Sequence, residues 1–218
     1  IWQKIGQSIA VSKPLIASAE SYEQHPLNPT MRVLVAGDSI GVGVGSTNNV
    51  DSLAGRIGRD LSQADITNIA VSGSRLVDLE KTLSEHGGTD YDLILLTIGA
   101  NDITHTTSLI DMQKTLARVL DRADLMGGKI ILLSAGNVGL CPAFLWPFSE
   151  YISWRAREVR KIFMAEALKH PGTAYVDLFN ERKNELFNTD IPRYYAPDLF
   201  HPSGEGYGIW YTTLKNQL

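Results

Sequence analysis

A serine, an aspartate and a histidine in this sequence have the types and spacing needed for nucleophilic catalysis. Ser39 lies in the Gly-Asp-Ser-Ile sequence of residues 37–40, whereas Asp198 and His201 are three residues apart near the other end of the chain. A serine hydroxyl is a weak nucleophile until a base accepts its proton. A histidine does this best when a carboxylate holds its ring in one tautomer, and one tight turn could join this pair. The set predicts a serine nucleophile that is activated by a histidine.

Two other residues could stabilise an oxyanion formed by such an attack. Gly73 can expose a backbone N–H with no side chain in the way, and the amide of Asn101 offers two donors. Donors aimed at a developing negative charge stabilise the transition state. Together with the backbone N–H of Ser39, these groups are predicted to form an oxyanion hole.

Strands and helices are predicted to alternate along the chain. Short aliphatic and β-branched runs predict strands, and longer stretches with apolar residues at helical spacing predict helices. The predicted strands are residues 32–36, 66–71, 93–98, 129–134 and 174–177. The predicted helices are residues 51–63, 75–83, 108–126, 147–170 and 203–218. This alternation is typical of an α/β protein with a parallel sheet.

Right-handed crossovers then favour a three-layer α/β/α sandwich around a five-stranded parallel sheet. In such sheets the functional site lies beyond the carboxyl ends of the strands. The loops at that edge are residues 37–45, 72–75, 99–105, 136–147 and the segment that follows the fifth strand as far as His201. The predicted fold therefore brings the candidate residues together.

Four blocks of the sequence resemble those of the SGNH hydrolases, which are also called GDSL esterases or lipases. Residues 37–40 resemble the nucleophile block, with isoleucine in place of leucine, and Gly73 lies where the family has its glycine oxyanion donor. The Gly-Ala-Asn-Asp sequence of residues 99–102 matches the G-x-N-D block, and the Asp-Leu-Phe-His sequence of residues 198–201 matches the D-x-x-H block. The blocks follow the family's order, each after its own strand.

This resemblance covers roughly residues 31–218 and implies a flavodoxin-like sheet that hydrolyses carboxylic esters without a cofactor. It implies that Ser39 is the nucleophile, that His201 is the base and that Asp198 orients the base. It also implies an oxyanion hole made by the backbone N–H groups of Ser39 and Gly73 and the side chain of Asn101.

The residues leave other functions open. An acyltransferase would form the same acyl-enzyme and pass the acyl group to an amine or a sugar instead of water. A non-catalytic flavodoxin-like module could bind a phosphate-bearing ligand, because Gly41, Gly43 and Gly45 follow a strand. Their spacing does not fit the dinucleotide-binding motif, however, and no Gly-Lys-Ser/Thr sequence of a P-loop follows.

A second aspartate and histidine, Asp102 and His105, have the same spacing as Asp198 and His201. We expect Asp198 and His201 to act in catalysis, because they follow the last strand, where the family's pair lies. We expect His105 to be a loop histidine and both Asp38 and Asp102 to have structural roles.

Two apolar stretches are predicted to wall a substrate pocket. Phe144, Leu145 and Trp146 follow the fourth strand, and Tyr195 and Phe200 approach from the last loop. Binding pockets for small molecules are mostly apolar with a few polar groups. The stretches favour a small-molecule or lipid-like acyl ester as the substrate.

The composition excludes several classes of protein. Twenty basic and twenty-four acidic residues give a net charge of −4, which argues against a nucleic-acid-binding protein. The single cysteine cannot form a disulfide framework within the chain, and with five scattered histidines it indicates no zinc ligand set. No apolar run reaches the length needed to span a bilayer.

The first thirty residues are predicted to form an arm, and residues 31–218 the hydrolase domain. Lys13, Pro14, Pro26 and Pro29 interrupt the arm, which shows no sustained period. We expect a strap over the domain surface or the stub of a removed membrane anchor. Residues 37–54 are also similar to a bacterial branch of predicted esterases that often carry a hydrophobic N-terminal segment. This favours an extracytoplasmic or membrane-tethered protein over a cytoplasmic one.

Overall fold

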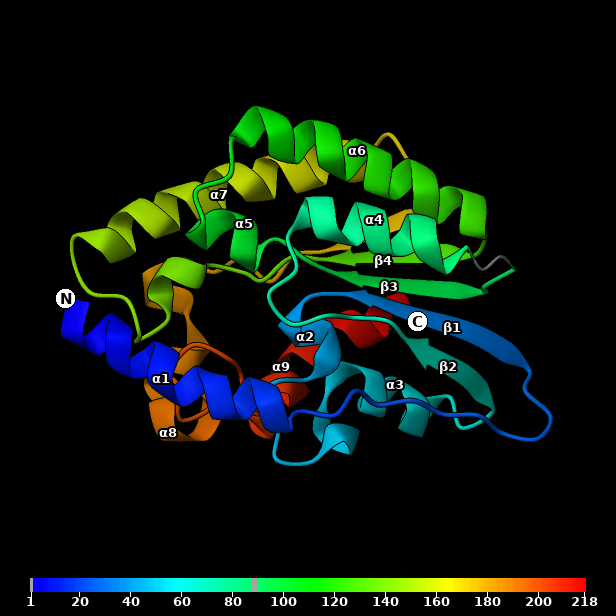
Figure 1. Ribbon diagram of the computed structural model, residues 1–218, viewed down its shortest axis with the longest axis horizontal. Coiled ribbons are helices and arrows are strands. Elements are labelled where there is room, and N and C mark those ends of the chain that lie inside the picture. The colour runs from blue at the N-terminus through cyan, green and yellow to red at the C-terminus, as the bar shows by residue number, and fades with distance from the viewer. Residues whose placement is uncertain (1, 88–89) are drawn as a thin grey trace.

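The computed structural model describes residues 2–87 and 90–218 and has a five-stranded sheet in the order β2-β1-β3-β4-β5 (Figure 1). The strands are β1 (Met31–Gly37), β2 (Ala64–Asn68), β3 (Leu93–Thr97), β4 (Lys129–Leu133) and β5 (Thr173–Val176). All four neighbouring pairs are parallel. The predicted five-stranded parallel sheet is therefore confirmed.

Helices cover both faces of this sheet and also gather at its carboxyl edge. They are α1 (Trp2–Ser18), α2 (Ser39–Val42), α3 (Leu53–Asp60), α4 (Leu76–His86), α5 (Ala100–Thr104), α6 (Leu109–Met126), α7 (Phe148–Ala167), α8 (Ile191–Tyr194) and α9 (Gly204–Leu214). Figure 1 shows α4, α6 and α7 on one side of the sheet and α3 and α9 on the other. The three-layer α/β/α prediction is confirmed.

Alternate residues of the central strand β1 pack into two separate cores. Leu34 and Ala36 contact the core beneath α4, α6 and α7. Val33 and Val35 contact the core beneath α3 and α9. A strand that is buried on both faces reads as a continuous apolar run rather than as an alternating one. This burial explains why the strands could be predicted from short aliphatic runs.

The helices differ from their predicted bounds mainly at their ends. Helix α3 begins at Leu53 rather than at residue 51, because Asn49–Asp51 forms a separate 3-10 turn and Ser52 caps the helix. The Ser52 hydroxyl accepts a hydrogen bond from the Gly55 backbone N–H at 3.1 Å, as N-cap serines do. The short helices α2, α5 and α8 were not predicted, since four or five residues are too few to show a helical period.

The N-terminal arm has more regular structure than its sequence predicts. It begins with the 17-residue helix α1, which contains Pro14, and continues as an extended segment along the edge of the sheet. There, Gln24 and Ile66 of β2 form an antiparallel bridge through backbone hydrogen bonds of 3.2 and 2.7 Å. The Gln24 side chain also donates to the backbone oxygens of Leu61 and Ala64. Ile1 of the predicted arm lies outside the described residues.

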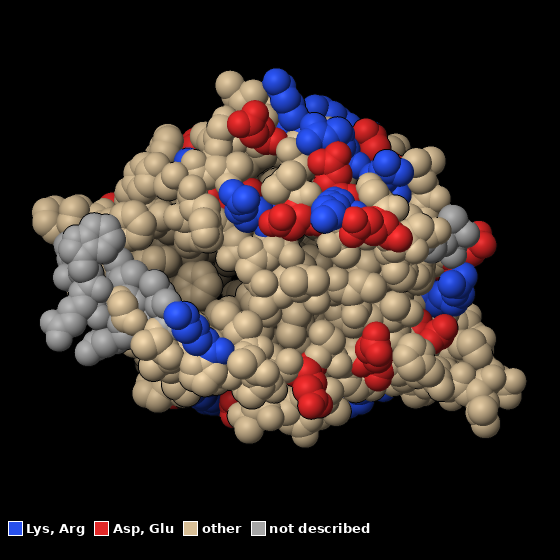
Figure 2. Space-filling view, in the orientation of Figure 1, with Lys and Arg blue, Asp and Glu red and all other residues tan. Residues whose placement is uncertain are grey.

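The surface around the carboxyl edge differs from the rest of the visible face. Figure 2 shows acidic and basic side chains interspersed over α4 and α6, and a hollow on the left that few charged residues surround. Ion pairs such as Arg118–Glu80, whose closest N···O distance is 2.7 Å, belong to the charged region. Within the described residues, we find no helix with both the length and the apolar character needed to cross a bilayer.

Candidate active site

Ser39, His201 and Asp198 form a continuous hydrogen-bonded chain at the carboxyl edge of the sheet. Ser39 Oγ lies 3.0 Å from His201 Nε2, and His201 Nδ1 lies 2.5 Å from Asp198 Oδ2. With the proton on Nδ1, the imidazole donates to the carboxylate and leaves Nε2 free to accept the serine proton. All three side chains are buried or nearly so.

The end of β1 positions Ser39 through a close approach between backbones. Gly37 has a φ of +141°, and a Cβ at this position would lie 1.9 Å from the backbone oxygen of Thr97 on β3. Only glycine fits there. Asp38 then caps α2, because its Oδ1 accepts a hydrogen bond from the Ile40 backbone N–H at 3.0 Å. Ser39 is consequently the first residue of a short helix directly beyond the strand.

Asp198 shapes the turn that carries both the candidate acid, Asp198 itself, and the candidate base, His201. Its Oδ1 accepts hydrogen bonds from the backbone N–H groups of Phe200 at 3.1 Å and His201 at 3.0 Å, while Oδ2 faces the imidazole. Leu199 inside the turn has a φ of +60°, an uncommon conformation for a branched residue. Burial alone would raise the pKa of Asp198, but hydrogen bonds, foremost from His201, hold it below its ordinary value. Asp198 therefore stays ionised.

The two loops predicted to supply oxyanion donors are tied together. Asn101 Nδ2 donates to the backbone oxygen of Ser74 at 2.9 Å, and Asp102 Oδ2 accepts from the Leu76 backbone N–H at 2.9 Å. Gly73 has a φ of +88°, and open space lies where its side chain would be. An amide nitrogen has two hydrogens, so Asn101 keeps one for a ligand.

One cleft brings these groups to a common space. It has a volume of about 420 Å³ and is lined by Ser39, Gly73, Asn101 and His201. It coincides with the hollow in Figure 2, beside α1. The cleft therefore exposes the candidate nucleophile, the candidate base and the three candidate oxyanion donors to one ligand.

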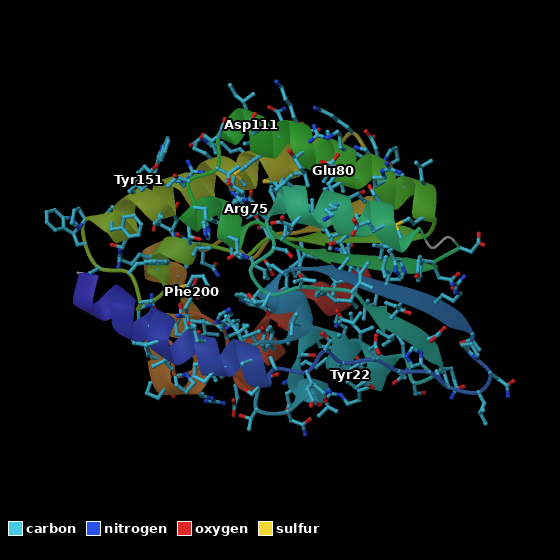
Figure 3. All side chains as sticks on the ribbon, viewed as in Figure 1. Tyr22, Arg75, Glu80, Asp111, Tyr151 and Phe200 are labelled. Atoms are coloured by element: carbon cyan, nitrogen blue, oxygen red, sulfur yellow. The ribbon has the colours of Figure 1, made fainter. Side chains whose placement is uncertain are left out.

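Aromatic side chains form the apolar wall of the cleft. Phe144, Phe148 and Phe200 line it, and the ring centroid of Phe144 lies 5.6 Å from that of Phe148 and 5.9 Å from that of Phe200. Figure 3 shows Phe200 between α1 and the helices above it. Ile16 of α1 adds an aliphatic surface. Phe148 and Ile16 could not be predicted from the sequence, because neither follows a strand directly.

Three residues predicted for this wall lie elsewhere. Leu145 and Trp146 border a neighbouring depression that Phe144 also lines, and the Trp146 side chain is 75% exposed. Tyr195 lines a cavity of about 40 Å³ that touches Ser39 and His201 from another side. Of the five predicted residues, the cleft is lined by Phe144 and Phe200. Side-chain directions in an irregular loop follow no sequence period, so the pattern of apolar residues could not separate these groups.

The alternative pair, Asp102 and His105, is not joined in the structure. His105 Nδ1 donates to the backbone oxygen of Asn101 at 2.9 Å, at the end of α5. The Asp102 carboxylate instead points to the backbone of Leu76. His105 lies on the cleft wall but has no carboxylate to orient it.

Asp38 is a buried carboxyl group, and ionising it destabilises the folded state. Burial raises its pKa to about 7, with a smaller contribution from the charge of Asp102. Oδ2 has no hydrogen-bond partner among the described residues. An unfolded aspartate has a pKa of about 3.9. The protonated Asp38 side chain therefore contributes its full share to the free energy of unfolding below that pH, and this contribution is lost as the pH rises through about 7.

The variant Asp38→Asn should therefore become relatively more stable as the pH rises. Asparagine keeps the oxygen that caps α2 but carries no charge. Between about pH 5 and about pH 8, the unfolding free energy of the variant minus that of the wild type should increase by on the order of 2 kcal/mol. Denaturant melts at both pH values measure this difference. An equal difference at the two pH values would contradict a costly buried charge at residue 38.

The described residues show no cluster of three or more histidine, cysteine, aspartate or glutamate side chains able to hold a metal ion.

Burial raises the pKa of the Cys141 thiol to about 12, so it stays protonated. A thiol in this state is a poor nucleophile. Among the described residues around the cleft, Ser39 is the one whose hydroxyl contacts a histidine that a carboxylate holds.

Together, the parallel sheet and the serine–histidine–aspartate arrangement at its carboxyl edge define a three-layer α/β protein with a serine-centred candidate site. Residues 35–209 match the GDSL-like Lipase/Acylhydrolase family. The chain belongs to this family, as its four sequence blocks predict. The comparison with curated proteins found no match.

Several solved structures share the fold. A member of the lipolytic protein G-D-S-L family from Veillonella parvula is 19% identical, with a TM-score of 0.69 over 86% of this chain and 97% of its own. An extracellular lipase from Streptomyces rimosus is 17% identical, with a TM-score of 0.64 over 87% and 100%. An acetyl xylan esterase is also 17% identical, with a TM-score of 0.61 over 86% and 100%. Proteins named as a lipase and as an acetyl xylan esterase thus share this fold, so the fold by itself does not indicate a substrate.

Proposed function

We propose that the protein is a serine esterase that hydrolyses carboxylic esters through an acyl-enzyme on Ser39. The observation that carries this proposal is the hydrogen-bonded chain from Ser39 through His201 to Asp198 at the wall of an open cleft. Membership of the GDSL-like lipase/acylhydrolase family supports lipolytic or esterase activity in general terms.

In the proposed first step, His201 Nε2 accepts the proton of Ser39 as its oxygen attacks the ester carbonyl carbon. The imidazolium that forms lies against the ionised carboxylate of Asp198, which stabilises its charge. The tetrahedral intermediate collapses when His201 returns the proton to the leaving alcohol, so that the acyl group stays on Ser39. Water then attacks the acyl-enzyme by the same route and releases the carboxylic acid.

The oxyanion of both intermediates would be held by the backbone N–H groups of Ser39 and Gly73 and by Asn101 Nδ2. All three residues line the cleft. The bond from Asn101 to the Ser74 backbone oxygen restrains the amide before substrate arrives. Donors that need no reorganisation contribute most to stabilising the transition state.

The aromatic wall indicates that the cleft accepts an acyl chain rather than a polar acetylated sugar. Phe144, Phe148, Phe200 and Ile16 present apolar surface, and burying such surface stabilises a bound chain by about 0.8 kcal/mol per methylene. We infer acyl esters with an aliphatic chain as the substrate class.

Phe144→Ala is expected to shift the preference towards longer or bulkier acyl groups, because it removes a ring from the cleft wall. The measurement is kcat/KM for p-nitrophenyl esters from acetyl to dodecanoyl. Trp146→Ala is a matched control: this exposed side chain borders the neighbouring depression and does not line the cleft, so its loss should leave the relative rates unchanged. Identical chain-length profiles for the wild type and Phe144→Ala would contradict the pocket assignment.

A further inference from the structure

The N-terminal helix α1 contacts the acid of the candidate triad directly. Ser12 Oγ donates to Asp198 Oδ2 at 2.7 Å, and Ser8 Oγ donates to the Asp198 backbone oxygen at 2.6 Å. A serine within a helix commonly bonds back to a carbonyl of its own preceding turn. Both hydroxyls instead reach the same residue, which lies 186 and 190 positions away in the chain.

These serines mark the inward face of α1. Of the α1 residues whose side chains the structure describes, Ser8, Ser12 and Leu15 are half-buried, and the others are exposed. Positions that are four and three apart lie on one face of a helix. The described part of this face thus joins α1 to the rest of the chain through polar contacts of Ser8 and Ser12. Figure 1 shows the helix beside the carboxyl edge of the sheet.

The contact completes the hydrogen bonding of the Asp198 carboxylate. Oδ1 accepts the backbone N–H groups of Phe200 and His201, and Oδ2 accepts both His201 Nδ1 and Ser12 Oγ. Ser12 is thus the one side-chain donor to this carboxylate, among the residues described, that lies outside the family match of residues 35–209.

We propose that Ser12 is a positioning residue for catalysis: its hydroxyl orients Asp198 Oδ2 towards His201 and limits how strongly that oxygen holds the imidazolium. This proposal rests on the proposed esterase function. The arm is then a working part of the active site, and not merely a strap over the surface. A hydrogen bond to an ionised group stabilises the charge. The Ser12 hydroxyl therefore makes Asp198 Oδ2, the oxygen that contacts His201 Nδ1, a weaker acceptor.

The other ionisable groups near Asp198 and His201 are the same in the wild type and in the Ser12 and Ser8 variants. The titratable and charged groups that face Asp198 and His201 are Lys13 of α1, Asp38 after β1, His105 after α5, Cys141 and Glu185 beside the small cavity, Tyr195, and Tyr207 of α9. Since they are common to all variants, a change in the pH profile on removing the Ser12 hydroxyl reports the loss of that donor.

Ser12→Ala is expected to lower kcat roughly tenfold with little change in KM, because the lost bond is to the triad and not to the substrate. The acidic limb of the pH profile of kcat/KM should move upwards by roughly half a pH unit or more. The limb moves upwards because a carboxylate that accepts one hydrogen bond fewer stabilises the imidazolium of His201 more strongly. The imidazolium then loses its proton only at a higher pH. Ser12→Thr keeps a hydroxyl and should restore both values.

The variant Ser8→Ala distinguishes positioning of the Asp198 carboxylate from a merely structural contact between α1 and the rest of the chain. It removes the bond to the Asp198 backbone oxygen but leaves the carboxylate fully hydrogen-bonded. Any fall in its activity should therefore come without movement of the acidic limb. A Ser12→Ala variant with the wild-type pH profile, or an equal shift in Ser8→Ala, would overturn the proposal.

The proposal can also be tested without turnover, which separates its failure from that of the esterase function. The titration of the His201 ring can be followed by NMR in a Ser39→Ala background, with and without Ser12→Ala. A titration midpoint that moves to higher pH on loss of the Ser12 hydroxyl supports the positioning role even if no ester is hydrolysed. An unchanged midpoint would overturn it.

Discussion

Replacing Ser39 by alanine is expected to reduce kcat for a short-chain chromogenic ester by a factor on the order of 10³ or more. The hydroxyl is the attacking group in the proposed mechanism, and its hydrogen bond to His201 Nε2 is the contact that activates it. Alanine leaves the oxyanion donors and the cleft wall in place, so a small residual rate above that of buffer is expected.

The control for Ser39→Ala is structural. Ser39 Oγ is described with one hydrogen-bond partner, His201, so its removal should leave the fold and the thermal midpoint close to those of the wild type. A folded Ser39→Ala protein that retains the wild-type kcat would contradict the assignment of the nucleophile. A large loss of stability would require comparison with Ser39→Cys, which keeps a nucleophilic atom at the same position.

Replacing His201 by alanine should be almost as damaging, with a loss on the order of 10³ in kcat. In the proposed mechanism the imidazole is the base that accepts the serine proton, and its Nδ1 lies 2.5 Å from Asp198 Oδ2. In contrast, His105→Ala should stay within a few-fold of the wild type, because His105 is bonded to the backbone oxygen of Asn101 and to no carboxylate.

This pair of histidine variants uses the two D-x-x-H sequences of the chain as matched controls for each other. Both substitutions remove one imidazole from the wall of the same cleft. Steady-state kinetics on one ester, at a pH where the wild type is fully active, compare them directly. A greater loss of activity in His105→Ala than in His201→Ala would reverse the assignment of the base.

The sheet and the convergence of the site could be predicted from the sequence because both depend on simple patterns. Strand β3 is buried on both faces and reads as an uninterrupted aliphatic run. The carboxyl ends of parallel strands share one edge, so Ser39 and His201 meet although they are 162 positions apart. Fold class and site follow from topology, which the alternation of elements determines.

The contact between α1 and Asp198 could not be predicted, because the side chains that make it, Ser8 and Ser12, are polar. A hydrophobic period is the signal that identifies a packed helix, and Pro14 further weakens it. The partner of these serines, Asp198, lies at the other end of the chain, and nothing local in the sequence joins them. In the loop before α7, Phe144 lines the cleft whereas Leu145 and Trp146 line the neighbouring depression, because side-chain directions in an irregular loop follow no sequence period.

The central claim is that Ser39 is an activated nucleophile. Reaction with a fluorophosphonate tests it most directly, since the nucleophilic oxygen forms a bond to phosphorus as fluoride leaves. The account predicts a single adduct, located by peptide mass spectrometry on Ser39, absent in Ser39→Ala and much slower to form in His201→Ala. An adduct on another residue, or labelling of Ser39 at the same rate without His201, would contradict it.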